Sequence, residues 1–139
     1  MKLIDVTVSR VIPGKPAEVF DVWLDPACPG SPFHGAAKML ITATVDGLFF
    51  WGHGNGTRTV PHYGRFTRID RGKLVEHTWM SESTHGLEST VSISFEPHAD
   101  GTQMTIQHRG LPDNDDGRGH EGGWNYFLGA LAKARGASK

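Results

Sequence analysis

Histidines and tryptophans at alternate positions are the residues of this chain that could do chemistry. Among its 139 residues are eight histidines and four tryptophans. Side chains two residues apart on a strand point to the same face of a sheet, so His77 and Trp79 share a face. The same alternation groups further side chains that we expect to point inward: Trp51 and His53, His62 and Phe66, and His108. These residues are the candidate lining of a ligand pocket.

A predicted helix near the end of the chain supplies a second wall for this pocket. His120 and Trp124 lie four residues apart, and Phe127, Leu128 and Leu131 continue the same apolar stripe. Residues at spacings of three and four share one face of a helix. We therefore expect His120 and Trp124 to face the sheet and to complete the site.

The inward-facing histidines have three interpretations. Each can be a core or rim imidazole with a hydrogen-bond partner and no ligand. Together with the tryptophans they can form a binding pocket, in which aromatic walls supply area and a few imidazoles orient a polar or anionic ligand. A pocket imidazole also titrates near neutral pH, so it could shuttle protons in a cyclisation, dehydration or hydrolysis. Glu121 and Asp46 are the nearest carboxylates for such a role.

A metal site is the least supported interpretation of these histidines. Three of them could bind Zn²⁺, but no H-x-H, H-x₃-H or HExxH spacing occurs, and the candidates lie on four different predicted strands. The single cysteine, Cys28, excludes an intrachain disulfide and a multi-thiolate site. The run from Asp113 to Asp116 lacks the glycine and the glutamate of an EF-hand and suits a helix N-terminus instead. We expect no metal and no cofactor, and no residue is assigned a catalytic role.

Seven stretches with strand patterns must position these side chains. Apolar and polar residues alternate in them, and turn pairs such as Asp46-Gly47 and Asp100-Gly101 separate them. The predicted strands span residues 2–12, 38–44, 48–53, 57–70, 73–80, 87–96 and 103–109. One helix is predicted from Pro16 to about Asp25, and residues 27–35, rich in proline and glycine, form a short second helix or an irregular turn. A long helix is predicted over 113–135, and its glycines make it depend on packing.

This order of elements predicts an α+β fold in a single domain, residues 1–139. Hairpins join the strands, so the sheet is antiparallel. A sheet of about six or seven strands with helices at both ends of the chain must curl to bury its apolar face. We expect it to wrap around the C-terminal helix and to enclose a pocket there.

Several local motifs follow one another in a recognisable order: Val11-Ile12-Pro13, Asp46-Gly47-Leu48-Phe49, Gly64-Arg65-Phe66, Thr78-Trp79, His108-Arg109-Gly110 and His120-Glu121-Gly122-Gly123-Trp124. With the order of elements, they resemble the helix-grip superfamily of START lipid-transfer domains, birch-pollen-allergen-like proteins and polyketide cyclases (SRPBCC). They are most similar to homologues of the activator of the 90-kDa heat-shock-protein ATPase. The resemblance implies the helix-grip fold and raises a co-chaperone role. The family usually has two glycines where Asp46-Gly47 stands.

Composition and charge argue against some classes of binding partner. The formal net charge is −1 and Lys and Arg are scattered, which argues against nucleic acid and anionic membranes. No stretch approaches a membrane span and the first residues lack the apolar run of a signal peptide, so we expect a cytoplasmic protein. The favoured function is binding of a small hydrophobic or aromatic ligand. A histidine-dependent cyclase, dehydratase or hydrolase is the alternative, the co-chaperone role is another, and a homodimer is left open.

Overall fold

One antiparallel sheet forms the body of the fold. The structure, a computed structural model, describes residues 2–36, 38–54 and 59–136, without the side chains of 53, 54 and 59. Its strands are β1 (Leu3–Ile12), β2 (Lys38–Ile41), β3 (Leu48–Gly54), β4 (Thr59–Asp70), β5 (Leu74–Ser81), β6 (Ser89–His98) and β7 (Gly101–Pro112). They are ordered β1-β7-β6-β5-β4-β3-β2, and every neighbouring pair is antiparallel. The predicted antiparallel sheet is confirmed.

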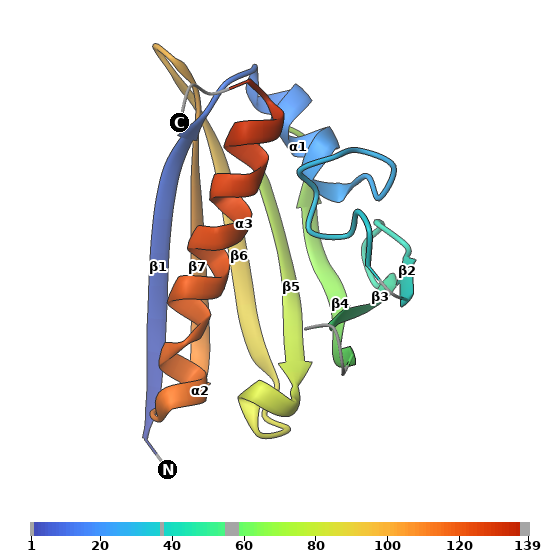
Figure 1. The fold of residues 1–139 in the computed structure, drawn as a ribbon, viewed down its shortest axis with the longest axis vertical. Helices are drawn as coiled ribbons and strands as arrows, with labels where there is room; N and C mark the ends of the chain where they lie inside the picture. Colours follow the sequence, from blue (N-terminus) through green and yellow to red (C-terminus); the bar gives the residue numbers. More distant parts are fainter. Residues whose placement is uncertain (1, 37, 55–58, 137–139) are drawn as a thin grey trace.

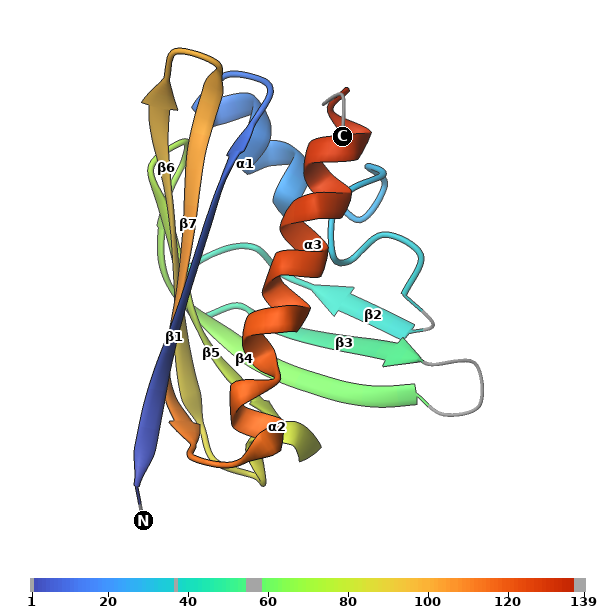
Figure 2. The same cartoon turned by 60° about the vertical axis from the view of Figure 1, so that its left-hand side comes forward.

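The long C-terminal helix lies against the concave face of this sheet. Figure 1 shows α3 (His120–Ala134) running along β1, β7 and β6. Figure 2 shows β2, β3 and β4 turning away from the other strands, so that the sheet curls around α3. This arrangement is the helix-grip fold that the order of elements predicted. None of the described helices is long and apolar enough to cross a membrane.

The helix predicted over 113–135 is divided into two pieces. A short helix α2 (Asp115–Arg118) precedes α3, and Gly119 joins them. Asn114 caps α2, because its side-chain oxygen accepts a hydrogen bond from the Gly117 N–H at 2.9 Å. Asp115 and Asp116 occupy the first turn, where carboxylates complement the partial positive charge of a helix N-terminus. The acidic run is therefore a helix start, as predicted from the sequence.

A first helix closes one end of the curled sheet. α1 (Pro16–Leu24) begins at Pro16, and Lys15 supplies no side-chain cap. Its buried residues are Val19, Phe20 and Trp23, and Phe20 packs edge-on against Phe95 of β6 with ring centroids 5.2 Å apart. The following residues 27–35 form turns rather than a second helix. A 3-10 helix, η1 (Glu82–Thr84), lies in the predicted loop between β5 and β6.

Alternation along the strands places the predicted side chains on the buried face. Trp51, Phe66, His77, Trp79 and His108 are all buried, while His62 is partly buried. Gly64 lies opposite Phe49 of β3, and a Cβ there would collide with that ring and with the Thr78 carbonyl. The expectation that this face points inward is confirmed. The side chain of His53 lies outside the described part of the structure.

Candidate functional site

A pocket of about 530 Å³ lies between the start of α3 and the strands β3, β4 and β5. Its wall contains five of the side chains that the sequence predicted: Trp51, His62, Trp79, His120 and Trp124. It also contains residues that the sequence analysis did not assign to the site: Ser83, Asp115, Asp116, Gly119, Gly123, Tyr126 and Phe127. Phe127 belongs to the apolar stripe of the predicted helix, so its spacing was a usable signal. Ser83 gave none, because only tertiary packing brings η1 to the pocket.

Aromatic side chains from the sheet and from the helix make most of this wall. The ring centroids of Trp51 and Trp79 are 5.7 Å apart, and those of Trp79 and Trp124 are 5.0 Å apart. His62 lies 4.7 Å from each of Trp51 and Trp79. Phe127 packs edge-on against Trp51 at 5.3 Å. Since such contacts fix ring orientation, the wall is a preformed aromatic surface.

His120 is the pocket imidazole with a defined tautomer. Indole nitrogen can only donate a hydrogen bond, so Trp79 Nε1 donates to His120 Nε2 at 3.4 Å. Nδ1 must then carry the proton, which it directs to the Asp116 carbonyl at 2.9 Å and the Gly117 carbonyl at 3.2 Å. Burial lowers the pKa of His120. The ring is neutral near pH 7, with its basic nitrogen at the pocket wall.

His108 lies behind the wall and holds Trp124 in place. Trp124 Nε1 donates to His108 Nδ1 at 3.0 Å. Ser89 donates its hydroxyl proton to the Trp79 carbonyl at 2.7 Å, so its oxygen accepts from His108 Nε2–H at 2.7 Å. The direction of each hydrogen bond in this chain is therefore fixed, from Trp124 through His108 and Ser89 to the Trp79 carbonyl. Burial, followed by the nearby imidazoles of His120 and His77, lowers the pKa of His108 to about 2.

His77 and Phe66 lie deeper in the core than the pocket wall. The ring of His77 is 4.9 Å from Phe49 and 5.7 Å from Phe66. Its Nδ1 donates to the Thr78 carbonyl at 2.8 Å, and burial lowers its pKa to about 4. A void of only about 10 Å³ separates His77 from Trp23 and Phe33. Phe66, His77 and His108 thus support the wall and do not line the pocket, and a binding role for them stays a prediction.

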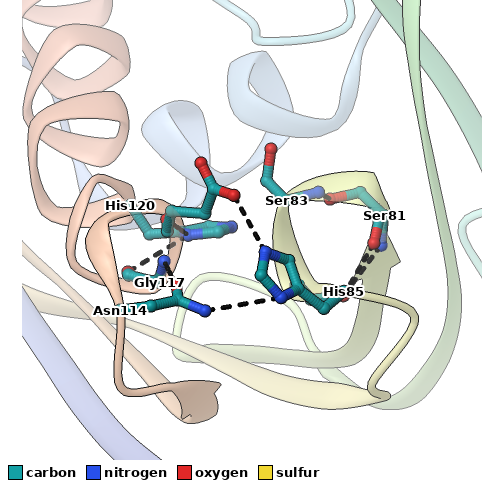
Figure 3. Close-up of polar contacts among 8 residues, drawn as sticks. Ser81, Ser83, His85, Asn114, Gly117 and His120 are labelled. Carbon is teal, nitrogen blue, oxygen red and sulfur yellow. Dashed lines mark hydrogen bonds and ion pairs between the residues drawn. The ribbon is translucent and has the colours of Figure 1, made fainter.

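An exposed clasp joins η1 to α2 at the mouth of the pocket. His85 Nε2 lies 2.9 Å from Asp116 Oδ2, and Asn114 Nδ2 donates to His85 Nδ1 at 3.4 Å. Figure 3 shows His85 between the η1 turn and Asn114, with His120 beside Gly117. His85 adopts the left-handed conformation (φ 55°) at the end of η1. The capping residues Ser81 and Thr84 fix the η1 turn, which His85 ends. These two residues are the sequence signal for a turn at this position.

This arrangement favours binding, and the imidazole and carboxylate side chains of the wall are His62, Asp115, Asp116 and His120. The wall is aromatic, and its polar groups gather at the η1 and α2 end. Among the side chains that the structure describes, no three His, Cys, Asp or Glu residues converge as metal ligands do. His120 is the pocket histidine whose tautomer is set by backbone carbonyls. The carboxylates Glu121 and Asp46, named from the sequence, do not line the pocket.

Comparisons with known proteins agree with the fold. A family model described as "Activator of Hsp90 ATPase homolog 1-like protein" matches residues 14–136. No curated protein matches the sequence. Protein CV1439 from Chromobacterium violaceum superposes with a TM-score of 0.74 at 20% identity, covering 94% of this chain and 96% of that one.

Two further solved structures share this fold. The Aha1 dimer from Colwellia psychrerythraea has a TM-score of 0.72 at 15% identity, covering 98% of this chain and 99% of that one. DynU16, from the dynemicin biosynthetic locus, has a TM-score of 0.73 at 17% identity, covering 96% of this chain and 50% of that one. At these identities the likeness shows the fold alone.

Proposed function

We propose that this chain, which belongs to the family of activator of Hsp90 ATPase homolog 1-like proteins, binds a small hydrophobic or aromatic molecule between β5 and α3. The single observation that carries the proposal is the pocket of about 530 Å³ walled by Trp51, Trp79, Trp124 and Phe127. Small-molecule sites commonly occupy about 300 to 1,000 Å³ and combine apolar walls with a few polar groups.

The polar groups at one end of the pocket give the ligand an orientation. His62, His120 and Ser83 line this end beside Asp115 and Asp116. An apolar ring would lie against the tryptophans, and a polar substituent would point toward η1 and α2. Because hydrogen bonds to His120 and His108 hold the indoles of Trp79 and Trp124, and ring contacts hold Trp51, little side-chain freedom is lost on binding.

A substitution that fills the pocket tests this proposal directly. Gly123 lines the pocket and Gly122 does not, and a Cβ at either position meets nothing within 4 Å. Leucine is better than glycine in a helix by about 1 kcal/mol, so both Gly123→Leu and Gly122→Leu should fold. We expect Gly123→Leu to lower the affinity for an apolar dye, anilinonaphthalene sulfonate, by about tenfold or more, equivalent to about 1.4 kcal/mol. Gly122→Leu should bind as the wild type does.

Native mass spectrometry of protein purified from its host identifies the natural occupant. We expect a bound organic mass on the wild type and on Gly122→Leu, and its loss on Gly123→Leu. If Gly123→Leu retained both the dye and the natural mass, the pocket would not be the binding site and the proposal would be wrong.

A histidine-dependent enzyme is the second candidate, and His120 is the observation that favours it. Its neutral ring directs Nδ1–H at backbone carbonyls. Its Nε2 accepts the Trp79 N–H at 3.4 Å, and it would act as a general base when a substrate proton replaces that long hydrogen bond. Turnover of cyclisation, dehydration or hydrolysis substrates that His120→Gln abolishes would support it. Equal rates for both proteins would remove His120. Stimulation of a heat-shock-protein ATPase stays a prediction from the family, and a stimulation assay tests it.

A further inference from the structure

The outer face of the sheet carries a row of exposed apolar side chains. Leu40 of β2 is opposite Phe50 of β3, Phe50 is opposite Tyr63 of β4, and Tyr63 is opposite Met80 of β5. Leu40 is 72% exposed, Tyr63 46% and Met80 37%. Side chains directly opposite one another on adjacent strands touch, so these four form one continuous stripe across four strands, which we call the outer row.

The outer row lies on the side of the sheet away from the ligand pocket. Each of its members alternates with an inward-facing residue: Phe50 with Trp51, and Met80 with Trp79. A hollow of about 320 Å³ runs along the row and is also lined by Leu48, 56% exposed. Phe50 and Tyr63 stack edge-on within it at 5.2 Å. Large contiguous apolar patches are rare on monomeric proteins and mark contact surfaces.

Two side chains of opposite charge border this apolar surface. Arg65 of β4 and Glu88, just before β6, both line the hollow. The Arg65 guanidinium donates to the Asp46 carbonyl at 3.0 Å. Within 2–36, 38–54 and 59–136, no carboxylate forms an ion pair with Arg65 and no cation forms one with Glu88. A surface with an apolar centre and one uncompensated charge of each sign is complementary to itself.

We propose that the outer row is the interface of a homodimer in which a second copy of this chain packs face to face around a two-fold axis. In a two-fold interface the same patch serves both copies, so Arg65 of each copy faces Glu88 of the other. The apolar rows meet between these two ion pairs. The outer row contributes four side chains, whereas a stable complex buries roughly 800 Å² on each partner. The dimer is therefore weak and depends on protein concentration.

Sedimentation velocity tests the dimer and its face together. We expect the wild type to shift from monomer to dimer as its concentration rises toward about 0.5 mM, where any association tighter than millimolar is populated. Met80→Lys should weaken the dimer at least about tenfold, since it places a charged, hydrated side chain in the apolar surface of each copy. Leu3→Lys removes another exposed apolar side chain, on β1 at the opposite edge of the sheet, and should leave the dimer unchanged.

A charge exchange distinguishes a second copy from any other occupant. Arg65→Glu and Glu88→Arg should each weaken the dimer about tenfold, because each faces like charges across the interface. The double variant Arg65→Glu/Glu88→Arg restores both pairs and should recover dimerisation. A wild type that stays monomeric would overturn the proposal, and so would a dimer that Met80→Lys and the single charge variants leave intact. Circular dichroism confirms that each variant is folded.

Discussion

Two buried neutral imidazoles should make the stability of this protein fall steeply below pH 6.5. Burial lowers the pKa of His77 to about 4 and that of His108 to about 2, from an ordinary value of 6.5. The unfolded chain takes up protons on both rings near pH 6.5, whereas the folded chain does not until well below that. Stability is therefore greatest above pH 6.5 and is lost as the pH falls from 6.5 toward 4.

The size of the effect follows from the number of protons. Over this range the unfolded state binds two more protons than the folded state, and each costs about 1.4 kcal/mol per pH unit. The free energy of unfolding should then fall by about 2.7 kcal/mol for each pH unit. His120 acts in the same direction, because burial lowers its pKa too. Since a domain of this size is stabilised by only about 5 to 15 kcal/mol in total, two pH units remove a large share.

Urea unfolding followed by tryptophan fluorescence measures this slope between about pH 6 and pH 5, where the unfolded histidines are mostly protonated and most carboxylates stay ionised. His108→Gln keeps an acceptor for Trp124 and a donor for Ser89 but binds no proton, so the slope should drop by about 1.4 kcal/mol per pH unit. His98→Gln is the matched control: water reaches this exposed position of β6 in both states, and we expect the wild-type slope. A wild-type slope in His108→Gln, or a ring signal of His108 that titrates near pH 6.5 in the folded protein, would refute the reasoning.

Three further substitutions test the supports of the pocket. Gly64→Ala should destabilise the fold by about 1 to 3 kcal/mol, because its Cβ collides with the Phe49 ring; urea unfolding measures this, and a neutral effect would contradict the contact. Ser89→Ala removes the acceptor of His108 Nε2–H and should cost about 1 to 3 kcal/mol, and its combination with His108→Gln should cost less than the two separately. Asp116→Ala breaks the exposed clasp, so stability should change by less than about 1 kcal/mol while stopped-flow dye association becomes faster; an unchanged rate would show that the clasp does not restrict the mouth.

The inward-facing set was readable from the sequence because a sheet with one buried face forces its side chains to alternate. Trp51, His77, Trp79 and His108 are buried for that reason. The two-residue alternation of a strand does not distinguish the buried side chains at an open pocket from those in the core. That difference depends on the path of α3 across the sheet, and residues far apart along the chain decide it.

Among the element boundaries that differ from the sequence prediction, two have clear local reasons. The strand expected to reach residue 44 ends at Ile41, because the chain turns at 42–47: Asp46 adopts φ 69° and its N–H donates to the Phe66 carbonyl. The helix expected from 113 begins at Asp115, because the Asn114 side chain caps it. A capping or turn role for Asn and Asp competes with continuation of the element, and the sequence alone does not say which one wins.

The glycines of α3 make this helix depend on contacts with the sheet, and the buried imidazoles supply two of those contacts. A helix with Gly122, Gly123 and Gly129 is intrinsically weak, so contacts with the sheet must fix it. Two indole–imidazole hydrogen bonds cross this boundary in opposite directions: Trp79 of β5 donates to His120 of α3, and Trp124 of α3 donates to His108 of β7. Each bond requires an unprotonated acceptor nitrogen, and burial favours the unprotonated form of both imidazoles in the folded protein. Since Trp79 and Trp124 are also pocket walls, we expect acid to release a bound ligand when the protein unfolds, and not by breaking these bonds in the folded state.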